Sequence, residues 1–250
     1  MKKVWTQVAL AVGALTFLGS AQASALVALI NFETAVATSN LVPFAPLLGS
    51  GDEFYQPGFA GRTMYFDPFS NAASAQPGDA VGAIINDPTI CAGLVCPTNN
   101  PSTYVGILND AVLAFGSTDG FRFSIKNFRA SFLGNGDTLP TTPGFLRLQG
   151  VRDGVSTNAT FALGGPDALG NLNFATFNTS GAFANTEFDL VYAYGFACPI
   201  GTGNCSAFST DRAQFAIDDI TIEHVPEPGS LALLGLAGFA AFAVSRRRSV

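Results

Sequence analysis

The stretch Phe188–Phe196 reads Phe-Asp-Leu-Val-Tyr-Ala-Tyr-Gly-Phe, so that bulky and small residues alternate along it. A period of two is typical of a β-strand that has one face in a core. Every bulky residue of the stretch lies on the same face of such a strand. We therefore expect that face to be buried.

Two other segments show the same period but change phase partway along. Phe121–Ile125 alternates in one phase and Phe128–Phe132 in the opposite phase, with the change near Asn127. Gln214–Ile222 changes phase at Asp218 and Asp219. A slip of one residue is typical of a β-bulge, so we predict a bulge at each of these two places.

The rest of the body also favours strands over helices. Short apolar runs are separated by Gly, Asn and Pro, and no internal segment sustains a period of 3.6 residues. Residues 67–105 are rich in proline, and we expect them to wrap around the domain instead of forming its core. The sequence predicts an all-β, jelly-roll-like β-sandwich over residues 26–223.

The N-terminus has the features of a signal peptide. Lys2 and Lys3 precede an uncharged apolar run from about Val8 to Leu18, which is followed by small residues around Ala23. This order is that of a secretory signal, with cleavage after Ala23 or after Ala25. We expect residues 1–25 to form a signal-peptide helix that engages the Sec machinery and is removed by signal peptidase.

The C-terminus, residues 224–250, combines three features in a fixed order. They are the triplet Pro226-Glu227-Pro228, the apolar run 231–244 and the basic residues Arg246, Arg247 and Arg248. The prolines disfavour continued regular structure, so the folded domain should end before them. The apolar run can form a helix about 21 Å long, which is short for the roughly 30 Å of bilayer hydrocarbon. We expect a marginal transmembrane helix with the arginines in the cytoplasm and the body outside.

This tail resembles the PEP-CTERM sorting signal, whose proteins are processed by membrane proteases called exosortases. The resemblance implies a protein of an exopolysaccharide-producing Gram-negative bacterium, tethered transiently to the inner membrane and then sent to the cell envelope or extracellular matrix. It implies cleavage near the proline triplet and exopolysaccharide as a partner. The segment Gln214–Asp218 also resembles a Gln-Phe-x-x-Asp element shared by a group of PEP-CTERM proteins, but that group implies no activity.

The charge of the body argues against nucleic-acid binding. Of 12 basic and 18 acidic residues in the chain, seven basic and 17 acidic ones lie in residues 26–225, which gives a formal charge of 7 − 17 = −10. A nucleic-acid partner requires a basic stripe, whereas an acidic surface keeps an exported protein soluble.

The four cysteines form two close pairs, Cys91 with Cys96 and Cys198 with Cys205. In an exported protein the simplest interpretation is two local disulfides, although four cysteines also allow bridges between the pairs. A zinc site is the alternative, but it would normally have a tighter Cys-x2-Cys or histidine spacing.

We expect no enzymatic activity, because the sequence has no nucleophile elbow, P-loop or metalloprotease motif. The sole histidine, His224, should be solvated beside the linker. Glycoside hydrolysis, which needs only two positioned carboxylates, remains an alternative.

We expect no cofactor. Asp218 and Asp219 are the best candidates for a Ca²⁺ site, although a turn cap and a solvated side chain explain them as well. A carbohydrate-binding module is the main alternative function, and exposed loop tyrosines such as Tyr55, Tyr65 or Tyr104 would stack on its sugars.

Overall fold

The computed structural model describes residues 24–33, 47–87, 91, 94–108, 110–134, 139–140, 142–198, 204–208 and 213–225. Val27–His224 forms one compact unit, the body of the protein. Most of the predicted signal peptide and the predicted transmembrane helix 231–244 lie outside the described residues. Within the described part, no helix is long and apolar enough to cross a membrane.

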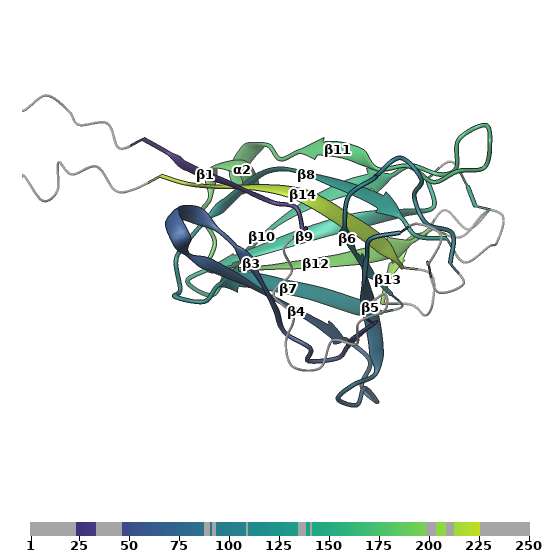
Figure 1. Cartoon of the computed structure of the whole chain (residues 1–250), viewed down its shortest axis with the longest axis horizontal. Coiled ribbons are helices and arrows are strands. Elements are labelled where there is room, and N and C mark those ends of the chain that lie inside the picture. The colour runs from purple at the N-terminus through teal and green to yellow at the C-terminus, as the bar shows by residue number, and fades with distance from the viewer. Residues whose placement is uncertain are drawn as a thin grey trace, which may run out of the picture. The chain divides into compact units, whose positions relative to one another are not determined.

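The described chain forms two antiparallel β-sheets that pack face to face, which confirms the predicted β-sandwich (Figure 1). Sheet A contains, in spatial order, β11 (Ala175–Asn178), β8 (Ser124–Phe132), β14 (Phe215–His224), β6 (Tyr104–Ile107), β5 (Ala80–Ile85) and β2 (Leu47–Gly49), and β1 (Leu26–Ile30) also pairs with β14. Sheet B contains β10 (Val155–Leu163), β9 (Gly144–Arg152), β12 (Leu190–Ala197), β7 (Ala111–Ser117), β4 (Thr63–Ser70) and β3 (Phe54–Pro57), and β13 (Ser206–Ala207) pairs with β12. The described helices are the 3₁₀ turn η1 (Phe59–Gly61) and the short α2 (Gly181–Asn185).

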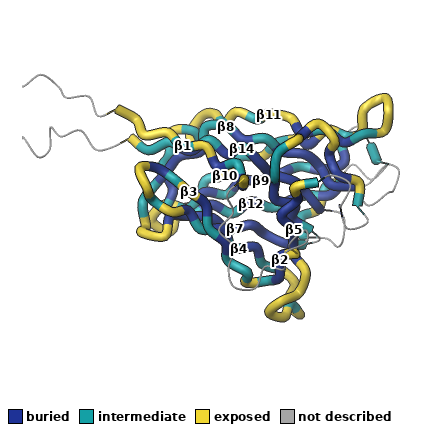
Figure 2. The backbone as a smooth tube through the Cα atoms, viewed as in Figure 1, coloured by how far each residue is buried: buried dark blue, intermediate teal, exposed yellow. Residues whose placement is uncertain are grey.

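Phenylalanine rings form a continuous row through the core between the sheets. Phe54, Phe66, Phe115 and Phe123 are stacked, with successive ring centroids 5.3, 5.2 and 6.1 Å apart. Phe66 lies opposite both Phe54 and Phe115 in the strand register, so cross-strand pairing sets the row. Figure 2 shows that the buried segments are the strands of the two sheets, whereas exposed segments occur mainly in their connections.

The two predicted bulges are confirmed, and they lie opposite each other. β8 and β14 are antiparallel neighbours, and their register shifts between Asp218 and Thr221 and again between Thr221 and Ile222. The first shift adds a residue to β14 and the second adds one to β8. Because the two insertions compensate, Phe215 and Ile222 both stay in the core although the phase of each strand has changed.

The prediction that the bulky face of Phe188–Phe196 is buried is wrong for most of the strand. In β12, Val191 and Ala193 face the core between the sheets, whereas Tyr192, Tyr194 and Phe196 lie on the outer face of sheet B and stay partly exposed. A period of two defines two faces but not which one is inside. On the inner face there is no room for a side chain at position 195, because a Cβ on Gly195 would lie 2.1 Å from the carbonyl oxygen of Ala213.

The expectation that residues 67–105 only wrap the domain is wrong in part. They include the end of β4 and all of β5, and Val81 and Ile84 belong to the main core. The described part of 91–103 does wrap: Cys91 and Cys96 pack with Tyr104 and other residues in a second cluster. Tyr104 is thus buried, not an exposed loop tyrosine.

One end of the sandwich is held by charges around Asp189. Its carboxylate accepts hydrogen bonds from Arg122 Nε at 2.7 Å and from the Asp153 backbone N–H at 2.8 Å, and Arg122 also contacts the Asp153 carboxylate. These links join the β9–β10 turn to the segments before β8 and β12. The Asp153 N–H and the Arg122 guanidinium hold the pKa of Asp189 below its ordinary value.

We predict that Asp189→Asn lowers the stability of the protein at neutral pH and that this difference disappears in acid. A carboxylate with a lowered folded-state pKa contributes stability above its unfolded-state pKa of about 3.9, and the contribution is lost as pH falls below that value. Urea unfolding midpoints of both proteins between pH 2.5 and pH 7 measure the difference. An equal difference at every pH would show that the charge of Asp189 is not what stabilises this end.

Candidate functional site

The residues of the predicted sorting signal lie outside the described part of the chain: Pro226, Glu227, Pro228, Arg246, Arg247 and Arg248. The structure does describe the strand that leads to them. β14 ends at His224, and its partner β1 is the first strand of the body. Figure 1 shows the start of β1 and the end of β14 side by side at one end of the body.

His224 is not the solvated residue that the sequence led us to expect. Its side chain is only 16% exposed, and Nδ1 lies 3.0 Å from Glu187 Oε1. Its ring packs on Phe121, with centroids 3.9 Å apart, and Arg62 also lies over the Phe121 ring. The histidine therefore anchors the end of β14 to the body.

Asp218, a weak calcium candidate, is a buried acceptor for protein donors. Its Oδ2 accepts hydrogen bonds from Asn100 Nδ2 at 2.8 Å and Ser102 Oγ at 2.9 Å, and its Oδ1 accepts one from the Asp219 N–H at 2.8 Å. Burial raises the pKa of Asp218, while the hydrogen bonds from Asn100 and Ser102 act in the opposite direction. The carboxylate thus fixes the loop before β6 against the bulge in β14.

Asp219, the other calcium candidate, points to a different partner. Its φ of 49° places it in the left-handed region, and its carboxylate lies 3.3 Å from Arg129 Nη1. The same Arg129 nitrogen donates to Asn100 Oδ1 at 2.9 Å. Among the described residues, no group of three or more His, Cys, Asp or Glu side chains is placed to hold a metal ion.

The Gln-Phe-x-x-Asp element therefore has a structural explanation. Phe215 lies in the core between the sheets, and Asp218 ties the wrapping loop to the opposite face of sheet A. The element thus places one residue in the core and another against the loop on the opposite face of β14. A period-two pattern alone does not reveal the contact with the loop.

The four cysteines form the two local disulfides that were predicted, Cys91–Cys96 and Cys198–Cys205. The first lies in the cluster that covers sheet A, and the second joins the end of β12 to the segment before β13. No described cysteine is free, so none has a thiolate to offer to zinc.

The outer face of sheet B carries a group of partly exposed aromatic side chains, which we call the aromatic face. Its members are Tyr55, Tyr65, Phe69, Phe145, Tyr192, Tyr194 and Phe196. Tyr55 and Tyr65 were predicted to be exposed loop residues, whereas the three aromatic residues of β12 were predicted to lie in the core. The alternation in Phe188–Phe196 was the signal that could have found them.

Small residues separate the aromatic side chains of β4 from those of β12. Val112, Ala114 and Gly116 of β7 occupy the same outer face. A Cβ on Gly116 would lie 2.9 Å from the Tyr65 ring, so the ring packs directly on the backbone of β7. Asp67 lies beside these β7 residues, and its buried Oδ1 accepts no hydrogen bond from the described residues.

A hollow of about 250 Å³ lies at the β9–β12 end of the aromatic face, lined by Phe145, Arg147, Thr160, Phe196 and Cys205. The Arg147 guanidinium lies 4.6 Å from the centroid of the Phe196 ring, and its Nε donates to Thr160 Oγ1 at 3.0 Å. Each of the other described lysines and arginines contacts a carboxylate, whereas Arg147 contacts none within the described part of the chain. The hollow therefore has an aromatic wall beside a guanidinium that forms no ion pair with the described residues.

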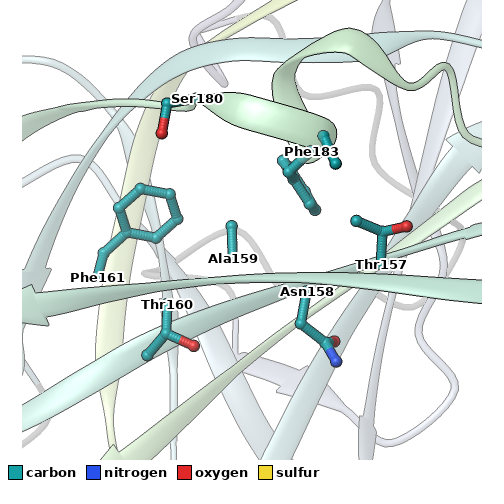
Figure 3. Close-up of a pocket in the computed structure, with 8 residues that line it drawn as sticks. Thr157, Asn158, Ala159, Thr160, Phe161, Ser180 and Phe183 are labelled. Atoms are coloured by element: carbon teal, nitrogen blue, oxygen red, sulfur yellow. The ribbon is translucent and has the colours of Figure 1, made fainter.

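A second hollow, of about 270 Å³, lies between β10 and α2. Figure 3 shows Thr157, Ala159 and Phe161 on the side of β10 that faces α2, and Asn158 and Thr160 on the other side. Among the described residues that line the two hollows, none is a carboxylate, and glycoside hydrolysis needs a pair of them.

Comparison with protein families found one match in the tail. Residues 224–248 match the model described as the PEP-CTERM protein-sorting motif, which confirms the predicted sorting signal. A comparison with curated proteins found no match to the chain. The match covers the tail alone and does not include the body.

We predict that Asp218→Ala destabilises the protein by about 2–4 kcal/mol, because it leaves Asn100 and Ser102 without their buried acceptor. The matched control is Asp219→Asn, which removes a partly exposed ion pair, tolerates the left-handed backbone and should cost less than about 1 kcal/mol. Urea unfolding at neutral pH measures both. Equal losses in the two variants would contradict the assigned role of Asp218.

Proposed function

We propose that this chain is an exported protein that an exosortase recognises through its C-terminal motif and that then resides in the cell envelope or extracellular matrix. The match to the sorting motif carries this proposal. Residues 1–25 would direct export, and the helix 231–244 would tether the chain to the inner membrane until the tail is cleaved near Pro226-Glu227-Pro228. A short apolar helix suits a temporary address of this kind.

The arrangement of the described strands is compatible with attachment at one end of the body. β1 and β14 are paired, and the start of β1 and the end of β14 lie at the same end of the body (Figure 1).

We further propose that the body is a non-catalytic, jelly-roll-like sandwich that binds a polysaccharide bearing carboxylate groups. The jelly-roll assignment rests on the chain crossing repeatedly from one sheet to the other between β4 and β12. The ligand class rests on the aromatic face. A sugar ring presents C–H groups on its flat face and hydroxyls around its edge, and aromatic rings attract the former through their negatively polarised faces.

One polar group fits the rest of such a ligand. Arg147, which pairs with no carboxylate of the described residues, can pair with an acidic sugar in the adjoining hollow. The proposal requires no calcium, because Asp218 and Asp219 already pair with protein donors.

We predict that replacing Pro226 and Pro228 together by alanine leaves export intact but blocks processing of the tail, so that full-length protein accumulates in the membrane fraction. Intact mass spectrometry of envelope and medium fractions measures the C-terminus. Replacing Leu169 by alanine, at an exposed site in the body, is the control and should leave processing unchanged. Normal cleavage of the double-proline variant would argue against the sorting proposal.

We predict that the exported protein binds polygalacturonate and that Tyr192→Ala with Tyr194→Ala weakens binding about tenfold or more. Arg147→Gln should weaken binding to polygalacturonate but not to a neutral glucan, because only the acidic polymer offers a carboxylate. Affinity electrophoresis in gels containing either polymer measures both effects, with Leu169→Ala as the control. Unchanged mobility of the wild-type protein in every acidic polymer tested would refute the binding proposal without affecting the sorting proposal.

A further inference from the structure

The two sheets have four edges along their main strand order, and one edge differs from the others. β2, β3 and β11 are short, with 3, 4 and 4 residues. The fourth edge strand, β10, has 9 residues, Val-Ser-Thr-Asn-Ala-Thr-Phe-Ala-Leu. It contains no charged residue and no proline.

β10 is also regular along its whole length. All of its residues from Val155 to Leu163 pair with β9 without a register shift. Its other edge pairs with no strand of the described residues, so a row of backbone donors and acceptors faces outward there. Proteins usually protect such edges with charges, prolines, bulges or short strands, and β10 has none of these protections.

We propose that β10 is an interface at which two copies of this chain pair antiparallel, β10 against β10, so that sheet B continues from one copy into the other. The unpaired backbone groups identify the partner as another β-strand. An antiparallel edge is complementary to itself under a two-fold axis, so an identical copy satisfies it without any second sequence.

Charge favours this edge over the rest of the surface as the place where copies meet. The body has a formal charge of −10, so two copies repel each other over most of their surfaces. β10 brings no charge to the contact. Its exposed residues Ser156, Asn158 and Thr160 share the outer face, where they can form hydrogen bonds across the new strand pair.

The pairing has a geometric consequence for the aromatic face. The two-fold axis that relates antiparallel strands within one sheet is perpendicular to that sheet, so the outer faces of both copies lie on the same side. The dimer would then present two aromatic faces to one polymer and could bind it with avidity. The pairing itself does not depend on polysaccharide binding.

The test uses the exported protein in sedimentation equilibrium over a range of concentrations. The wild-type protein should dimerise, and Ser156→Lys with Asn158→Lys should weaken dimerisation about tenfold or more, because it places like charges across the strand pair. Leu169→Lys, which adds a lysine at an 86% exposed site away from β10, is the control and should dimerise like the wild type. Circular dichroism checks that each variant is folded.

A charge-swap experiment separates edge pairing from other kinds of association. Ser156→Asp with Asn158→Asp should also be monomeric alone, but mixing it with the double-lysine variant should restore a dimer. A wild-type protein that stays monomeric, or a dimer that the double-lysine variant leaves intact, would overturn the proposal. Failure of the mixed variants to associate would do so as well.

Discussion

Strand β14 is the element on which the rest of the structure depends. Its bulge at Asp218 and Asp219 is the constraint that allows one face of the strand to fill the core while the other face binds a loop. β14 pairs with β8, β6 and β1, so it connects most of sheet A. On one face Phe215 and Ile222 fill the core between the sheets, and on the other Asp218 holds the loop that contains Asn100 and Ser102. Without the bulge, a regular strand could not keep apolar residues inward at both ends.

The matching insertion in β8 shows why the two bulges occur together. An extra residue in one strand reverses the direction of every side chain beyond it, unless its neighbour changes phase at the same place. β8 does so at Lys126 and Asn127, after which the register of the two strands is the same as before. The charged side chains near the bulges form ion pairs between the two strands: Lys126 contacts Glu223, and Arg129 contacts Asp219.

The sequence predicts the strands, the bulges, the local disulfides and the sorting tail, because each is encoded by neighbouring residues. It does not predict which face of β12 is inside, since that depends on what packs against it. The large residues Tyr192, Tyr194 and Phe196 indicate a core, but the carbonyl of Ala213 approaches Gly195 so closely that no side chain fits inward at that position. His224 and Tyr104 were misplaced for a related reason: their partners, Phe121 and Phe174, are distant in the sequence.

The same competition for space explains why the candidate site lies outside the core. The inner face of β12 has no room for a side chain at Gly195, and the aromatic residues of this strand lie on the outer face, where neither sheet covers them. Exposed aromatic residues usually cost a secreted protein solubility. Here the acidic charge of the body offsets that cost by keeping copies apart, and the uncharged strand β10 leaves one edge at which they can still approach. Under the two proposals, charge distribution and strand packing would together leave one face of the body for a polymer and one edge for another copy.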